Sequence, residues 1–154
     1  MITSARCPVS QDCQALQTGR VALFPASRPR RERPQREARL LLVENGAGEV
    51  LFERRPPAGI WGGLWCLPLI DGDGEAAPWL RQHYGQPAEL VAELASFSHA
   101  FTHFELRLIP LRLRALPGAQ AVNESRQTRW IHPGAELPGL PTPVSRFLAG
   151  LHDP

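Results

Sequence analysis

One stretch of this chain cannot form a regular element inside a folded core, so it limits where the folded part can lie. The stretch is 17–37, which holds three prolines and five arginines between Arg28 and Arg36. Proline lacks a backbone donor and like charges repel, so we expect an extended linker here. The globular part is then expected to start near Ala38, and 154 residues suit one domain.

Apolar periodicity after the linker predicts several strands and two helices. A β-hairpin is expected from strands 39–44 and 49–54 around the Gly-containing turn 45–48. Further strands are expected at 64–70, 91–97, 105–116 and 129–131, with helices at 75–84 and 143–151. Residues 1–16 are expected to be a partly helical lead. This mixture favours an α+β fold.

Charge and hydropathy restrict the function classes only weakly. The formal net charge is +2, and all basic residues are arginine, for which a GC-rich coding sequence is the simplest explanation. No apolar run is long enough to span a bilayer and the N-terminal residues lack a signal-peptide pattern. We therefore expect a soluble cytoplasmic protein with no membrane partner. If the linker lies along nucleic acid, its arginines are candidate phosphate contacts: Arg28, Arg30, Arg31 and Arg33.

Three cysteines are an odd number, which argues against a disulfide framework. Cys66 lies in an apolar segment and is expected to be a small core residue. Cys7, followed by Pro8, and Cys13 resemble the end of a loop that binds an iron-sulfur cluster. Such a cluster normally needs four thiolates, and Ser4 stands where a preceding Cys-x2-Cys would begin. We expect a truncated or vestigial site and no metal in this chain.

Two segments combine aromatic and polar residues in a way that suggests recognition of a base. Segment 55–68 reads Arg-Pro-Pro-Ala-Gly-Ile-Trp-Gly-Gly-Leu-Trp-Cys-Leu-Pro, and segment 97–104 reads Phe-Ser-His-Ala-Phe-Thr-His-Phe. The Gly62-Gly63 step between two tryptophans predicts a rigid apolar turn that lets backbone approach a ligand closely. The second segment sets a hydroxyl and two histidines beside flat apolar surface.

Together these segments resemble the C-terminal domain of MutY-type adenine DNA glycosylases. The resemblance spans nearly the whole chain: Cys7 and Cys13 match the third and fourth ligands of that family's iron-sulfur loop, and 22–25 matches its interdomain connector. It implies a remnant of the iron-sulfur loop at 1–16, an interdomain linker at 17–37 and a lesion-recognition domain at 38–154. The implied fold is a Nudix-like, mixed-sheet α/β/α sandwich.

The resemblance also implies function and partners. The expected role is recognition of 8-oxoguanine mispaired with adenine in double-stranded DNA, on behalf of an N-terminal glycosylase domain. A [4Fe-4S] cluster is implied for a full-length parent only. A role in repair of genomic DNA also implies localisation at the bacterial nucleoid. The family's Phe-Ser-His loop aligns with Phe101, Thr102 and His103, so Thr102 keeps the hydroxyl and is expected to hydrogen-bond the lesion. Phe101 is expected to pack or stack, and His103 to contact phosphate or orient the loop.

Other residues near these motifs leave alternatives open. His99 suits a DNA contact as well as a hydrogen bond at a strand end, and Phe97, Phe101 and Phe104 are also ordinary core residues. Ser98 lies outside the aligned loop and is expected to be structural. Trp61 and Trp65 are expected to be scaffold that shapes the turn at Gly62 and Gly63.

The Nudix likeness raises an enzymatic alternative, a nucleotide pyrophosphohydrolase. That activity needs clustered carboxylates on one helix to bind magnesium. The Nudix spacing after Pro68 puts Leu69 at the Gly position and Glu75 at the first Glu, but the remaining key positions are His83, Tyr84, Pro87 and Ala88. With no carboxylate at these four, no catalytic residue is assigned. Glycosylase chemistry is not expected either, since the family places it in a helical N-terminal domain. A third possibility is a Nudix-fold module that docks a protein.

Overall fold

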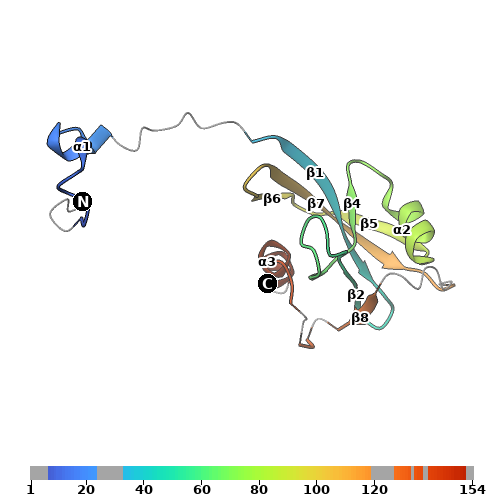
Figure 1. The fold of residues 1–154 in the computed structure, drawn as a ribbon. Helices are drawn as coiled ribbons and strands as arrows, with labels where there is room; N and C mark the ends of the chain where they lie inside the picture. The colour runs from blue at the N-terminus through green and yellow to red at the C-terminus, as the bar shows by residue number, and fades with distance from the viewer. Residues whose placement is uncertain (1–6, 24–32, 119–126, 133, 137–138, 152–154) are drawn as a thin grey trace. The chain divides into compact units, whose positions relative to one another are not determined.

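The computed structural model describes residues 7–23, 33–118, 127–132, 134–136 and 139–151, and divides the chain into two units, Met1–Glu32 and Arg33–Pro154. In the first unit the described residues form a short helix α1 (Gln14–Gln17) and a 3-10 turn η2 (Val21–Leu23), and neither buries a residue (Figure 1). The helix lies at the end of the expected lead at 1–16 and runs one residue past it.

In the second unit the described strands form one mixed sheet. Its main order is β3-β2-β1-β7-β5, with β4 paired to β1, β6 to β7 and β8 to β2. Strands β1 and β7 run parallel in the centre and the other pairs are antiparallel. The strands are β1 (Gln35–Glu44), β2 (Val50–Arg54), β3 (Trp65–Cys66), β4 (Leu69–Asp71), β5 (Ala88–Glu93), β6 (Phe97–Ala100), β7 (Glu105–Ala115) and β8 (Thr128–Ile131).

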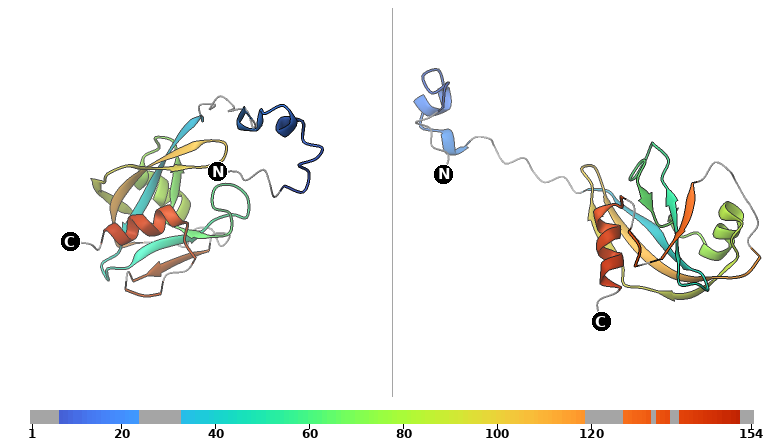
Figure 2. Two further views of the ribbon diagram at one scale, coloured as in Figure 1. Left: turned by 90° about the vertical axis from the view of Figure 1, so that its left-hand side faces the viewer. Right: turned by 90° about the horizontal axis from the view of Figure 1, so that it is seen from below.

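Two helices cover opposite faces of this sheet, α2 (Ala76–Tyr84) and α3 (Thr142–Gly150) (Figure 2). Alternation along β1 divides its apolar side chains between the faces: Leu40 lies in the core with α3, and Leu41 in the core with α2. Helix α2 ends at Gly85, whose left-handed φ of 61° makes glycine favourable there. The α+β fold with a mixed sheet is therefore confirmed.

Local patterns predicted most elements correctly. Strand β2, the long strand β7 and both helices lie within one residue of the expected bounds, and β1 ends at the expected residue. Strand β1, however, begins at Gln35, so the last residues of the expected linker are in the sheet. The parallel pairing with β7 extends that far, since Gln35 is opposite Glu105 and the Glu105 N–H donates to the Pro34 carbonyl at 3.0 Å.

Two expected strands are wrong in their continuity, and proline accounts for both breaks. The expected strand 64–70 is divided at Leu67 and Pro68 into β3, which pairs with β2, and β4, which pairs with β1. The expected strand 91–97 spans the gap between β5 and β6. This gap faces Pro110 of β7, which has no N–H to donate to an edge strand, although its carbonyl accepts from Leu94 at 2.8 Å.

Candidate functional site

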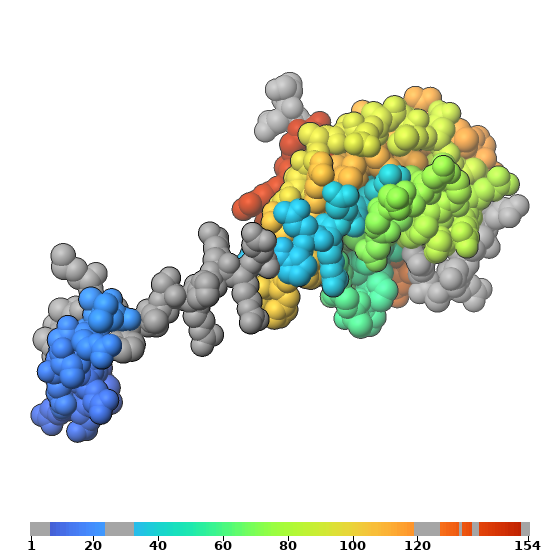
Figure 3. Space-filling view, turned by 90° about the horizontal axis from the view of Figure 1, so that it is seen from above, coloured from blue at the N-terminus to red at the C-terminus, as the bar shows by residue number. Residues whose placement is uncertain are grey.

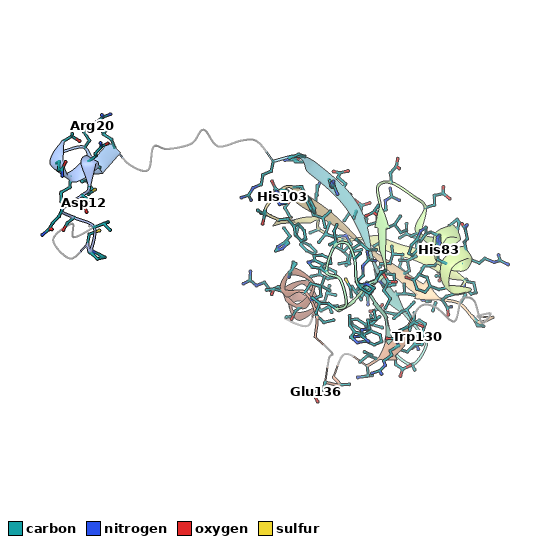
Figure 4. The ribbon with its side chains drawn as sticks, in the orientation of Figure 1. Asp12, Arg20, His83, His103, Trp130 and Glu136 are labelled. Atoms are coloured by element: carbon teal, nitrogen blue, oxygen red, sulfur yellow. The ribbon has the colours of Figure 1, made fainter. Side chains whose placement is uncertain are left out.

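The tip of the β6–β7 hairpin presents a hydroxyl and an imidazole in the turn that connects two stacked rings. The Phe101 N–H donates to the Phe104 carbonyl at 2.8 Å, which closes a tight turn. The rings of Phe101 and Phe104 stack at 4.6 Å with an interplanar angle of 18°. Thr102 and His103 occupy the turn and are exposed, and Figure 4 places His103 at this end of the hairpin. Neither side chain has a hydrogen-bond partner among the described residues.

The loop 55–64 lies against this hairpin and joins the two motifs found in the sequence. The Trp61 ring is 6.0 Å from Phe101 and 6.3 Å from His99, and His99 meets Phe101 edge-on at 4.7 Å. Trp61, His99, Phe101 and Phe104 are named here the aromatic cluster. All four are partly buried, and the three apolar rings also pack on the core. Phe101 and Phe104 therefore pack on the core as well as on each other.

The adjacent glycines Gly62 and Gly63 of this loop are required by its backbone. A Cβ on Gly62 would lie 2.3 Å from the Pro57 carbonyl oxygen, closer than non-bonded atoms approach. Gly63 has a φ of 76°, and its N–H is directed at the carbonyls of Arg55 and Pro56, both at 3.2 Å. Trp61 itself has a positive φ of 56°, which is strained for a residue with a bulky side chain. The loop holds the Trp61 ring against His99 and Phe101 although the Trp61 backbone is strained.

Arg36 adds a cation to the cluster that sequence analysis did not assign to the site. Its guanidinium lies 4.7 Å from the centroid of the Phe104 ring, a cation–π geometry. This contact depends on the parallel pairing of β1 with β7, which local patterns do not reveal. Strand β1 and the hairpin lie side by side on the surface in Figure 3. Arg33 is exposed just before β1, whereas Arg28, Arg30 and Arg31 lie outside the described residues.

The cysteines occupy different environments. Cys66 is fully buried, and burial raises the pKa of its thiol to about 12, consistent with a small core residue. Cys7 is exposed and Cys13 partly exposed, and these two thiolates do not make up the four that a [4Fe-4S] cluster needs. Among the described residues, no group of three or more His, Cys, Asp or Glu side chains could hold a metal ion.

A cavity of about 1030 Å³ lies where the loop 55–64, β4 and α2 meet, on the side where a Nudix helix would carry its carboxylates. Glu53 is 2% exposed on its floor and pairs with the Arg55 guanidinium at 2.7 Å. Tyr84, at a carboxylate position of the Nudix pattern, donates its hydroxyl to Glu53 at 2.5 Å. Glu53, Arg55 and Tyr84 are named here the buried polar network.

The other Nudix positions also lack the chemistry of a magnesium site. His83 stacks on Trp79 at 4.4 Å, with its Nδ1 2.9 Å from the Trp79 carbonyl oxygen. The helix ends at Gly85, before the positions of Pro87 and Ala88. Glu75 is exposed at the N-terminus of α2.

No helix among the described residues has the length and apolar character to cross a membrane.

A mixed sheet between two helices, with a long loop beside the second strand, defines a domain of the Nudix class. The chain belongs to the NUDIX domain family, whose model matches residues 39–150. Among solved structures, the MutT protein of Methanosarcina mazei Go1 has a TM-score of 0.61 at 18% identity, covering 78% of this chain and 94% of that one. The C-terminal domain of mouse MUTYH, solved in complex with human PCNA, has a TM-score of 0.55 at 21% identity and covers 76% and 88%.

Curated relatives extend the likeness beyond the fold. The adenine DNA glycosylases of two Buchnera aphidicola subspecies, Acyrthosiphon pisum (strain APS) and Schizaphis graminum (strain Sg), are 23% and 22% identical over 143 residues. Each match covers 92% of this chain, and the chain spans about two fifths of each relative's length, 40% and 41%. The resemblance to adenine DNA glycosylases therefore extends well outside the two motifs that first suggested it.

Proposed function

We propose that this domain recognises 8-oxoguanine opposite adenine in double-stranded DNA and serves an adenine DNA glycosylase. The observation that carries the proposal is the hairpin tip, where Thr102 presents a free hydroxyl beside the stacked rings of Phe101 and Phe104. Similarity to adenine DNA glycosylases over 92% of the chain supports the same role.

The chemistry of the lesion matches the groups at this tip. Oxidation at C8 adds a carbonyl acceptor and turns N7 from an acceptor into an N–H donor, so the edge that a protein can probe changes its polarity. The Thr102 hydroxyl can accept from N7–H, and a nearby backbone N–H can donate to the new oxygen. We assign phosphate contacts to His103 and Arg36, and the aromatic cluster supports the turn that carries Thr102.

The remaining parts of the chain fit this role as follows. The lesion-recognition domain begins at Arg33, just before β1. The residues from 17 up to it are the linker to a glycosylase domain, and 1–16 are a remnant of an iron-sulfur loop whose remaining ligands would come from that domain. Base removal needs an extruded adenine in a pocket with positioned acids, and we assign that step to the glycosylase domain. A protein that acts on genomic DNA in this way would work in the cytoplasm, at the bacterial nucleoid.

Binding to matched duplexes tests the proposal. Duplexes that differ only in an 8-oxoguanine:adenine, guanine:adenine or guanine:cytosine pair would be compared by fluorescence anisotropy at fixed salt. A hydrogen bond to the altered edge is worth about 1–3 kcal/mol of discrimination, so the lesion duplex should bind roughly 5- to 150-fold more tightly. Thr102→Ala should abolish this preference, Thr102→Ser should keep it, and Thr128→Ala, an exposed threonine in β8, should leave it unchanged.

The other function classes give different results in the same assays. Equal affinity for the three duplexes, or a preference that survives Thr102→Ala, would contradict the proposal and favour a protein-docking module. Magnesium-dependent release of phosphate or pyrophosphate from nucleotides would instead identify a hydrolase, for which the cavity beside α2 offers few carboxylates.

A further inference from the structure

A second groove lies between strand β6 and helix α3, next to the aromatic cluster. Its volume is about 360 Å³. Its apolar wall is the stacked pair Phe97 and Phe147, with ring centroids 5.5 Å apart. Four residues with polar side chains also line it: Ser98, His99, Thr142 and Arg146. The edge of β6 that faces away from β7 pairs with no other strand in the described part of the chain, which leaves backbone donors available at the groove.

The charge of this groove is positive and uncompensated. None of its lining residues is acidic, and Arg146 has no ion pair or hydrogen bond among the described residues. The exposed arginines of β7 differ, since each reaches a carboxylate. Arg107 pairs with Glu37 at 3.1 Å, Arg112 with Glu44 at 2.8 Å and Arg114 with Glu89 at 3.1 Å. A free guanidinium in a groove that Thr142 and His99 also line suits a phosphate oxygen.

The groove is close enough to the hairpin tip to engage the same duplex. His99 belongs to both sites, since it lines the groove and contacts Phe101. Three residues separate His99 from Thr102, and even a fully extended backbone would span only about 10 Å at roughly 3.3 Å per residue. Because Phe101 and Thr102 lie in a turn, the two sites are closer than this limit, which corresponds to about three base steps of DNA at about 3.4 Å per step.

We propose that this groove binds a backbone phosphate of the DNA within about three base steps of the lesion, with Arg146 as the main cationic contact. The inference rests on the proposed function for its ligand. In it the hydroxyl of Thr142 and the imidazole of His99 donate to the remaining phosphate oxygens, and the pair Phe97 and Phe147 packs against the adjoining deoxyribose. The site adds affinity without sequence information, because a phosphate is the same at every position.

The charge-removing variant Arg146→Gln tests this site against a matched control. Arg81→Gln removes the same charge from an exposed position on α2, on the opposite face of the sheet. Arg146→Gln should weaken binding to lesion and undamaged duplexes alike, by about tenfold. It should also reduce the slope of log K against log salt by about 0.9, the value for one lost phosphate contact. Arg81→Gln should change neither, and Arg146→Lys should recover part of the loss.

A neutral methylphosphonate locates the contact along the DNA. Placed singly at successive positions, it should weaken binding of the wild-type chain most at one position within about three steps of the lesion, and should have no further effect there in Arg146→Gln. Equal effects of the Arg146 and Arg81 variants, or an unchanged salt slope, would overturn the inference. So would loss of the lesion preference in Arg146→Gln. The undamaged duplex keeps this test separate from the proposed function, because it measures the phosphate contact even if Thr102 gives no discrimination.

Discussion

The cavity beside α2 and the tip of the β6–β7 hairpin both set polar side chains next to aromatic rings, but they use them differently. In the cavity, Arg55 and Tyr84 both donate to the Glu53 carboxylate, so both of its oxygens are engaged inside the protein. At the tip, Thr102 and His103 are exposed and have no partner among the described residues. A Nudix hydrolase places its chemistry on the α2 side, whereas the groups free to meet a ligand here lie at the hairpin.

This difference shows how one fold can change its function without changing its architecture. Tyr84 and His83 occupy positions where the Nudix pattern has residues of the metal-binding helix. Here their side chains pack and make hydrogen bonds within the protein. The side that would hold magnesium becomes part of the scaffold. The hairpin is free to vary its tip because its ends are fixed by β7 in the centre of the sheet.

The strongest test of the scaffold role is to remove the charge at the centre of the buried polar network. Glu53→Gln leaves the Arg55 guanidinium without its carboxylate in a mostly buried site, and should lower the free energy of unfolding by about 3 kcal/mol. Urea unfolding measures this loss. Glu37→Gln is the matched control, because its pair with Arg107 is about half exposed and should contribute less than about 1 kcal/mol.

The same variant separates the two regions functionally. In the absence of urea, and where Glu53→Gln remains folded, this variant should prefer the lesion duplex to the same degree as the wild type. A lost preference in folded Glu53→Gln would mean that the network takes part in recognition, and the contrast between cavity and tip would fail.

A smaller effect is expected from Gly62→Ala, which acts on the loop that joins the two regions. The added methyl would meet the Pro57 carbonyl oxygen at 2.3 Å, so the loop must shift, at a cost of about 1–3 kcal/mol. Trp61 would then move against Phe101, and the lesion preference should fall. Gly46→Ala is the control, since a Cβ there meets nothing within 4 Å and should change stability by less than about 0.5 kcal/mol. An unchanged preference in Gly62→Ala would show that Trp61 does not support the tip.

Elements that depend on local sequence could be predicted, and those that depend on distant partners could not. The helix at 75–84 and the hairpin at 39–54 follow from nearby apolar spacing and turn residues. The break between β5 and β6 depends on Pro110, which lies in another strand and enters only through pairing. The two proline-linked breaks have one cause: a missing N–H donor.

The candidate site divides in the same way. Phe101, Thr102 and His103 were assigned from their likeness to a short family loop, and their roles stay predictions. Arg36 and Arg146 carried no such signal: the first reaches Phe104 through the parallel pairing of β1 with β7, and the second reaches the groove by the packing of α3. Trp61 was expected to be scaffold, and its contacts with His99 and Phe101 add a direct support of the tip.

The last test concerns Cys66, which lies opposite Glu53 in the sheet and reports whether water reaches this part of the scaffold. Burial raises the pKa of this thiol from 9.0 to about 12, so only the unfolded chain ionises it between these values. The stabilisation from the neutral buried thiol is complete below pH 9 and is lost as the pH rises toward 12. In a Cys7→Ser, Cys13→Ser background, stability should therefore fall across this window by up to about 1.4 kcal/mol per pH unit.

The control for this titration is Cys66→Ala in the same background. Its free energy of unfolding should lack the part of the decrease that comes from Cys66 and keep the part that comes from other titrating groups. Alkylation gives a second measurement: the native Cys66 thiol should not react at pH 8, whereas the exposed Cys7 of the wild-type chain should. Rapid alkylation of Cys66 in the folded protein would mean that water reaches the β2–β3 pair. The cavity side would then be accessible to solvent, as only the hairpin tip is proposed to be. The contrast between the two regions would lose its physical basis.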